Sequence, residues 1–182
     1  DRATDLLNLI GDLLDLSSVR GQTARPERAE PLQLGDVLDD VVEFMRVEAE
    51  EKDIALQVDV AANLVPVLAP ADQMKLVWTN LLSNAVKYSR PGGVVDVALT
   101  QDDVDVVGRV GDTGIGIASE DTPHVFDEFF RASNARQVSP HGSGVGLATV
   151  RLILENWGGR ISVESESGRG STFTFTLPRA QV

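Results

Sequence analysis

The chain has 182 residues, with 16 Lys and Arg against 28 Asp and Glu, which gives a formal net charge of −12 at pH 7. This acidic balance argues against nucleic-acid binding, because phosphate backbones are bound by clustered cations. The absence of cysteine excludes a disulfide framework, a thiol nucleophile and cysteine-ligated zinc, and the apolar runs are too short for the roughly 20 residues that cross a bilayer.

The first predicted element is a helix over residues 3–19. Its apolar side chains have helical spacing, at Leu6, Leu7, Ile10, Leu13, Leu14 and Leu16. Such a stripe packs either against another helix or, as a terminal helix, on its own domain. Residues 21–30 include Gly21 and Pro26 and almost no large apolar side chain, which predicts a linker. Because the chain opens at Asp1 within the predicted helix, we expect it to be part of a longer protein.

Alternating and helical patterns follow one another after the linker. We predict strands at residues 31–34, 54–60, 65–69, 94–100, 104–110, 160–166 and 171–177, and helices at 36–52, 70–89, 122–130 and 143–157. Helices gathered with a mainly antiparallel sheet predict a two-layer α+β domain, preceded by a single helix. Residues 132–141, named the lid from here on, lack apolar anchors, and we expect a mobile segment there.

The predicted helix 70–89 carries an unusual polar face. Asn80, Asn84 and Lys87 fall within roughly 60° of one another around its axis, opposite its apolar face. Amide oxygens can ligate a Mg²⁺ ion that keeps water and phosphate as its other ligands, and a lysine supplies a point charge for phosphate. An exposed polar face without any ligand explains the same pattern equally well.

Two glycine-rich segments add candidate sites. Asp112 ends a predicted strand and is followed by Gly114 and Gly116, which permit close approach of a ligand to the backbone. The carboxylate could accept a hydrogen bond from an amino group of a base, although a plain glycine turn is the alternative. Residues 142–146 precede a helix, where free N–H groups and the helix dipole bind anions. The alternative there is a flexible loop with a glycine hinge.

In this order the segments resemble the catalytic, ATP-binding domain of bacterial sensor histidine kinases of the GHKL, or Bergerat-fold, superfamily. The matching segments are NLLSNAVKYS (residues 80–89), DTGIGI (112–117), FDEFFRAS (126–133), GSGVGLATV (142–150) and GRGSTFTFTLP (168–178). The resemblance covers about residues 31–178. Residues 6–17 are more loosely similar to the second helix of the family's dimerisation and phosphoacceptor hairpin.

The resemblance implies a Bergerat α/β sandwich that holds ATP and Mg²⁺ under a lid. It divides the chain into part of the dimerisation helix (residues 1–20), a linker (21–30) and the catalytic ATP-binding domain (31–182). The implied activity is donation of the ATP γ-phosphoryl group to a histidine of a phosphoacceptor hairpin, within a homodimer in the cytoplasm. A response-regulator receiver domain is the implied downstream partner, and neither nucleic acid nor direct membrane contact is implied.

The family's site residues carry over to matching positions. Asn84 would coordinate Mg²⁺, Asn80 and Lys87 would contact the phosphates or the water shell of the metal, and Asp112 would accept a hydrogen bond from the adenine amino group. Asn80, Lys87 and Arg131 are the implied catalytic residues. The remaining implied ATP-binding residues are Tyr88, Gly114, Gly116, Ile117, Gly142, Ser143, Gly144, Val145, Gly146, Leu147 and Ser171.

Two features bear on the reaction. The hydrolytic members of the superfamily carry Glu where this chain has Asn80, and an amide cannot act as a base for water, which favours a kinase over a hydrolase. Neither His124 nor His141 is followed by the family's phosphoacceptor pattern, so we expect the chain to bind ATP without phosphorylating itself. A regulatory module that lost catalysis and a serine kinase of the anti-sigma type are the alternatives.

Overall fold

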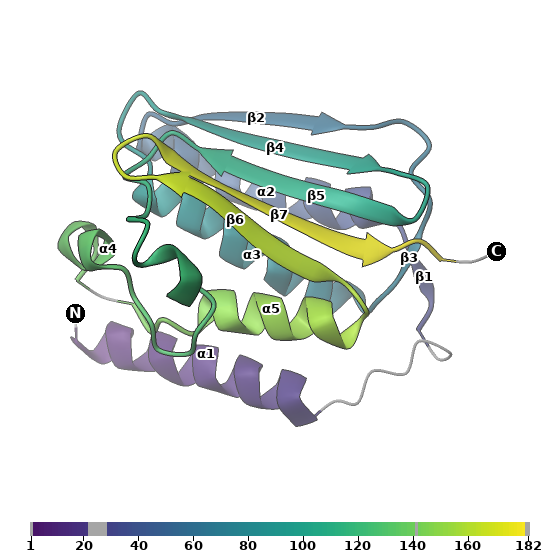
Figure 1. Cartoon of the computed structure of the whole chain (residues 1–182), viewed down its shortest axis with the longest axis horizontal. Helices are drawn as coiled ribbons and strands as arrows, with labels where there is room; N and C mark the ends of the chain where they lie inside the picture. The colour runs from purple at the N-terminus through teal and green to yellow at the C-terminus, as the bar shows by residue number, and fades with distance from the viewer. Residues whose placement is uncertain (1, 22–28, 141, 181–182) are drawn as a thin grey trace.

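The computed structural model describes residues 2–21, 29–140 and 142–180. Its helices are α1 (Arg2–Gly21), α2 (Leu34–Glu51), α3 (Ala71–Tyr88), the 3₁₀ turn η2 (Thr122–His124), α4 (Ser133–Val138) and α5 (Gly146–Asn156). Its strands are β1 (Pro31–Leu32), β2 (Ala55–Val60), β3 (Val67–Leu68), β4 (Val94–Gln101), β5 (Asp105–Asp112), β6 (Arg160–Glu166) and β7 (Gly170–Pro178). Figure 1 shows the sheet as one layer and α2, α3 and α5 as the other.

The sheet has five strands in the order β2-β4-β5-β7-β6, and β1 pairs separately with β3. The β2–β4 pair is parallel, and every other pair in the larger sheet is antiparallel. The parallel pair needs a crossover, and the chain makes it with β3 and α3. The predicted two-layer fold with a mainly antiparallel sheet is confirmed.

The core explains why α3 turns its polar side away from the sheet. Trp78 is fully buried and packs edge to face on Phe175 of β7, with ring centroids 4.9 Å apart. Gly108 of β5 makes room for this pair, since a Cβ there would lie 2.3 Å from the Phe175 ring. With its apolar side fixed on the sheet, α3 is left with Asn80 and Asn84 on the side that faces α5 and the lid.

Two predicted helices differ from the structure, and one further short helix was not predicted. The helix expected from residue 143 begins at Gly146, because Gly144 has a φ of 72° that no right-handed helix accommodates. The helix expected over residues 122–130 is the three-residue turn η2, and Phe129 beyond it has a φ of 62°. The lid contains the short helix α4, which its polar composition did not indicate; His141 lies outside the described residues.

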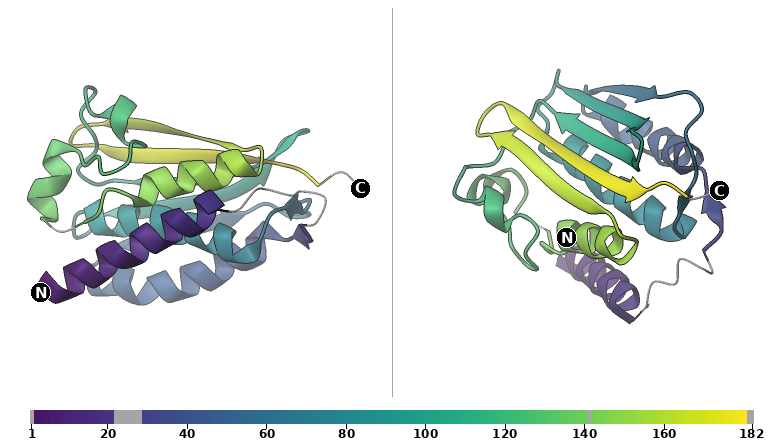
Figure 2. Two further views of the ribbon diagram at one scale, coloured as in Figure 1. Left: turned by 90° about the horizontal axis from the view of Figure 1, so that it is seen from below. Right: turned by 45° about the vertical axis from the view of Figure 1, so that its right-hand side comes forward.

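The N-terminal helix α1 lies alongside α5 (Figure 2). Leu16 and Val19 of α1 are buried, while Leu6, Leu7 and Leu14 are more than half exposed. Of the two possibilities left open by the sequence, the structure has α1 docked on its own domain with part of its apolar face uncovered. Within the described residues, no helix combines the length and apolar character that a membrane crossing needs.

Candidate functional site

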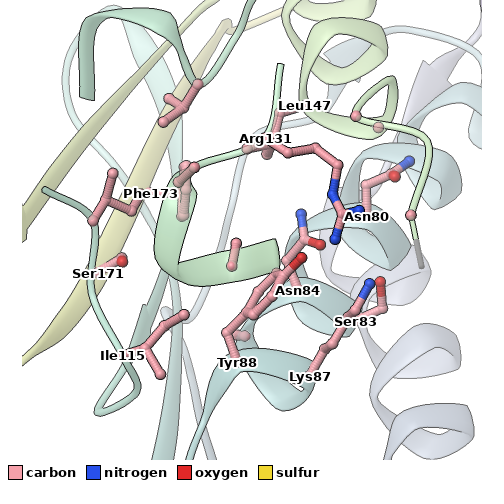
Figure 3. Close-up of a pocket in the computed structure, with 18 of the residues that line it drawn as sticks. Asn80, Ser83, Asn84, Lys87, Tyr88, Ile115, Arg131, Leu147, Ser171 and Phe173 are labelled. Atoms are coloured by element: carbon pink, nitrogen blue, oxygen red, sulfur yellow. The ribbon is translucent and has the colours of Figure 1, made fainter. Parts of the chain in front are cut away.

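A cavity of about 270 Å³ lies between α3, the start of α5, the segment after β5 and the lid. In Figure 3, Asn84, Lys87 and Tyr88 rise from α3 on one side of it, and Ser171 and Phe173 line the opposite side. Of the sixteen residues expected to bind ATP, fourteen line this cavity, namely Asn80, Asn84, Lys87, Tyr88, Asp112, Gly116, Ile117, Arg131, Gly142, Ser143, Gly144, Gly146, Leu147 and Ser171. Gly114 and Val145 do not.

The polar face of α3 is oriented by its own backbone. The Nδ2 amide of Asn80 donates a hydrogen bond of 2.9 Å to the carbonyl of Leu76, one turn earlier. Its Oδ1 is thereby turned toward the start of α5, where a Cβ added to Gly146 would lie 2.3 Å from it. Glycine at position 146 therefore lets α3 and α5 come close enough for the Asn80 amide oxygen to lie beside the N-terminus of α5.

Lys87 is the cation of this helix face. Its Nζ lies 5.2 Å from the centroid of the Tyr88 ring, a cation–π contact that keeps the charge beside the cavity. The sequence placed both residues at the site, and both line the cavity.

Asp112, Ser171 and Phe173 form what we name the acidic end of the cavity. The Asp112 carboxylate accepts a hydrogen bond of 2.8 Å from the backbone N–H of Gly114 and another from the backbone of Ser171. Burial raises the pKa of Asp112, and the two backbone donors oppose that rise without cancelling it. The group is thus a half-buried acceptor held in one orientation by the chain.

The glycines beside Asp112 act through backbone geometry. Gly116 has a φ of 62°, and a Cβ there would lie 2.0 Å from the carbonyl oxygen of Glu166. A Cβ on Gly114 would lie 2.3 Å from the carbonyl oxygen of Tyr88. Gly114 does not line the cavity, but its backbone N–H donates a hydrogen bond to the Asp112 carboxylate and so orients that group.

Residues 142–146, named the glycine loop from here on, lead into α5. The Ser143 hydroxyl accepts a hydrogen bond of 3.2 Å from the N–H of Val145, and the Val145 side chain is fully buried. Val145 therefore stabilises the glycine loop and does not face the cavity. Gly146 and Leu147, in the first turn of α5, line the cavity. A helix start of this kind binds anions through its free N–H groups.

Arg131 lines the cavity and also holds the lid. Its Nη1 donates a hydrogen bond of 2.9 Å to the carbonyl of Pro140, and its Nη2 donates one to the carbonyl of Ser139. The Arg131 guanidinium was expected to contact phosphate. In the structure it holds the end of the lid close to Arg131, the residue directly before the lid.

Several cavity residues were missed by the sequence analysis, and Asp12 is the most consequential. It belongs to α1, and its carboxylate accepts a hydrogen bond from the Ser143 hydroxyl. An ion pair between Arg20 and Glu128 fastens the other end of α1. Only the docking of α1 brings Asp12 here; the apolar stripe of this helix left docking open as one of two possibilities, but it did not indicate that Asp12 would reach the site. The other missed lining residues are Ser83, Ala85, Ile115, Val125, Phe130, Ala132, Asn134, Ala135 and Phe173.

The oxygen atoms that the cavity offers suit a hard cation that keeps water and phosphate among its ligands. Among the described residues, no group of three or more His, Cys, Asp or Glu side chains could enclose a metal ion. Asn80 and Asn84 supply neutral amide oxygens on one face of α3. Such a partial set fits Mg²⁺, which retains several waters and takes phosphate oxygens as ligands.

Comparison with known proteins gives a family match. Residues 69–181 match the family described as histidine kinase-, DNA gyrase B-, and HSP90-like ATPase. The sensor-like histidine kinase SenX3 of Mycobacterium tuberculosis is 35% identical over 176 residues, which are 97% of this chain and 42% of SenX3. The chain thus spans less than half the length of this relative.

Solved structures agree with the match. The mycobacterial sensor histidine kinase MprB superposes with a TM-score of 0.71 at 31% identity, covering 84% of this chain and all of that one. Full-length ShkA, solved in complex with AMPPNP, superposes with a TM-score of 0.82 at 30% identity, covering 100% of this chain and 37% of ShkA. The ShkA alignment includes the segment that corresponds to α1.

Proposed function

The chain belongs to the family of histidine kinase-, DNA gyrase B-, and HSP90-like ATPases, and we propose that it is the ATP-binding catalytic domain of a sensor histidine kinase. The observation that carries the proposal is the meeting of Asp112, the Asn84 face of α3 and the glycine loop around one cavity. By their chemistry these three suit, in turn, a base, a metal-bound phosphate chain and a terminal phosphate.

ATP would lie with its adenine at the acidic end. The Asp112 carboxylate would accept a hydrogen bond from the adenine amino group, and Tyr88, Ile117 and Phe173 offer apolar surface near it. Gly114 and Gly116 support this binding indirectly, since their tight backbone contacts fix the segment after β5. A hydrogen-bond acceptor fixed before binding costs little reorganisation when the base arrives.

The triphosphate would extend toward the start of α5. The N–H groups of the glycine loop and of Leu147 would receive its oxygens, and Lys87 and Arg131 would add positive charge. Asn84 would hold Mg²⁺, with Asn80 near the metal's water shell. When bound, Mg²⁺ would neutralise the charge that develops on the phosphates during transfer.

We propose transfer to a histidine of a separate helical hairpin. An imidazole nitrogen would attack the γ-phosphorus, the bond to the β–γ bridging oxygen would break, and ADP would leave with that electron pair. Asn80 stands where a hydrolase needs a base, so it would leave water unactivated. His124 is engaged elsewhere, since its Nδ1 lies 3.0 Å from an Asp127 carboxylate oxygen.

The proposal extends to the domains and partners of the longer protein. Residues 1–20 would be the end of the second helix of the dimerisation hairpin, 21–30 the linker and 31–182 the catalytic domain. The exposed leucines of α1 support this division, because an uncovered apolar stripe is what a helical bundle would bury. The parent protein would act as a homodimer and pass its phosphoryl group to a receiver domain.

The test uses ATP labelled at the γ-phosphate. The parent protein, with its hairpin histidine, should acquire label that is lost in acid and kept in base, as phosphohistidine chemistry requires. The 182-residue chain alone should acquire none and should release ADP only slowly. Rapid ADP release by the chain alone would instead indicate a hydrolase, and label on serine would indicate a serine kinase.

A further inference from the structure

Ser165 lies on β6 behind the acidic end of the cavity, outside every motif described above and outside the cavity lining. Its hydroxyl makes three hydrogen bonds. The backbone N–H of Ile117 donates to its Oγ at 2.8 Å, its own hydroxyl donates to the carbonyl of Gly170 at 2.8 Å, and its Oγ lies 2.9 Å from the Oγ of Ser171.

These three contacts fix which serine donates to the other. Ser165 has a single hydroxyl hydrogen, and the carbonyl of Gly170 can only accept. If Ser165 donated to Ser171 instead, the contact with Gly170 would join two oxygens without a hydrogen between them. Ser171 must therefore donate its hydrogen to Ser165. The consequence is that the Ser171 hydroxyl can only accept a hydrogen bond from a molecule in the cavity.

Ser171 stands directly beside Asp112. The two are paired across β5 and β7, so their side chains lie on the same face of the sheet. Both line the cavity, and Ser171 is only 8% exposed. The acidic end thus presents two neighbouring acceptors, an aspartate and a serine whose hydrogen is already used.

The same hydroxyl ties together the two segments that form this end. Through the N–H of Ile117, Ser165 holds the segment after β5 against β6. A second tie lies nearby, where the N–H of Gly168 donates to the carbonyl of Ile115 at 2.7 Å. The hydrogen bonds of Ser165 therefore fix which groups at the acidic end accept a hydrogen bond from a ligand. This arrangement does not depend on a hydroxyl that rotates freely.

We infer that Ser165 is a positioning residue for base recognition, which acts through Ser171 to favour purines with an amino group at C6 over purines with an oxo group there. An amino group donates to the two acceptors, whereas an oxo group would meet their lone pairs. A mismatch in such a desolvated position leaves polar groups unpaired, which is more costly than losing a hydrogen bond in water. This inference rests on the proposed nucleotide site.

The test measures the dissociation constants of ATP and inosine triphosphate, each with Mg²⁺, by calorimetry on the whole chain. The two nucleotides differ at C6 and in the proton on N1, while their phosphates are identical. The wild-type chain should prefer ATP. Ser165→Ala frees the Ser171 hydroxyl to donate, so the preference for ATP should fall ~5-fold, the change expected from one hydrogen bond. Ser165→Thr keeps the hydroxyl and should restore the preference.

Ser162→Ala is the matched control. Ser162 lies on the same strand, and its hydroxyl donates to the carbonyl of Thr174 at 3.4 Å on the exposed side, so this variant should keep the wild-type ratio. If Ser165→Ala does not fold, Ser165→Cys weakens the same bonds and should shift the ratio in the same direction. Adding Ser165→Ala to Ser171→Ala should change the ratio no further, since Ser165 acts through Ser171.

The outcomes separate the two proposals. If the wild-type chain binds no ATP, the proposed function and this inference both fail. If it binds ATP but prefers it no more than inosine triphosphate, or if Ser165→Ala weakens both nucleotides by the same factor, Ser165 has only a structural role and the inference alone is overturned.

Discussion

The Asp12 carboxylate of α1 accepts a hydrogen bond from the Ser143 hydroxyl in the glycine loop. A carboxylate thus occupies the end of the cavity that is proposed for the phosphates of ATP. An anionic side chain at this end disfavours an anionic ligand there, because like charges repel. We therefore expect the docked position of α1 to weaken nucleotide binding.

This relationship predicts the effect of Asp12→Asn. The variant removes the negative charge and keeps the size of the side chain, so its affinity for MgATP should rise ~3- to 5-fold at low salt, as for one partly exposed charge pair. The gain should shrink as salt is added. Calorimetric titration at two salt concentrations measures both effects.

Asp15→Asn is the control for this prediction. Asp15 lies on the same helix and carries the same charge, but it does not line the cavity. Equal gains in the two variants would mean that net charge, and not the contact with Ser143, sets the affinity.

The magnesium role of Asn84 predicts a specific loss. In Asn84→Ala, the factor by which Mg²⁺ tightens ATP binding should fall ~10-fold or more, a loss typical of disturbed metal sites. The far-UV circular dichroism should not change, because the side chain faces the cavity and not the core. Titrations with Mg²⁺ and with a chelator give the factor directly.

Asn156→Ala provides the comparison for Asn84, since Asn156 is an amide at the end of α5 away from the cavity. It should leave the magnesium factor unchanged. An Asn84→Ala protein with the wild-type factor would remove Asn84 from the metal site.

The raised pKa of Asp112 predicts how stability depends on pH. Burial favours the protonated acid in the folded chain, so between the ordinary pKa and the raised one the folded state binds more protons than the unfolded state. The Asp112 contribution is then fully present below that window and is lost as the pH rises through it. Relative to Asp112→Asn, the wild-type chain should lose free energy of unfolding as the pH rises.

Denaturant titrations of both proteins, from about pH 3.5 to 7, measure this difference, in which the other carboxyl groups cancel. A difference that is constant with pH, or that grows in favour of the wild type, would contradict the raised pKa. ATP affinity should show the opposite slope, because the adenine amino group needs the ionised acceptor, and it should fall as the pH is lowered through the raised pKa.

The glycine contacts near Asp112 predict a large difference between two similar substitutions. Gly116 and Gly168 both have positive φ, at 62° and 84°. A Cβ at Gly168 meets nothing within 4 Å, whereas one at Gly116 would lie 2.0 Å from a backbone oxygen. Gly168→Ala should therefore cost only about 1–2 kcal/mol of stability, the conformational penalty alone.

Gly116→Ala should cost several kcal/mol, about 3 or more, because the backbone of β6 must also move. Thermal and denaturant unfolding of the two variants compare them directly. Equal losses would show that the contact between the two segments is looser than the structure has it.

Most of the fold was accessible from the sequence because its periodicities are clear. The alternation in β4 and β7 and the apolar face of α3 each specify one buried side, and the observed elements agree with the predicted ones within a few residues. The errors fell at the glycine loop, where the positive φ of Gly144 delays the start of α5, and at residues 125–130, which do not continue the turn η2 as a helix. Composition indicates the glycines of this loop but does not say at which of them the helix begins.

The candidate site was predicted as a set of motifs, and the structure adds the contacts between them. Asn80, Asp112 and Ser171 were named from the sequence and line one cavity. Asp12 and Ser165 were not, because their positions depend on the docking of α1 and on the β6–β7 register. Contacts between segments far apart in the chain leave no local pattern in the sequence.

The central claim is that this cavity binds ATP together with Mg²⁺, and calorimetric titration of the 182-residue chain tests it most directly. One ATP should bind per chain, more tightly with Mg²⁺ than with a chelator, and Asp112→Ala should weaken it more than it weakens inorganic triphosphate. If neither the wild-type chain nor Asp12→Asn binds ATP, or if Mg²⁺ has no effect on the affinity, the account is contradicted.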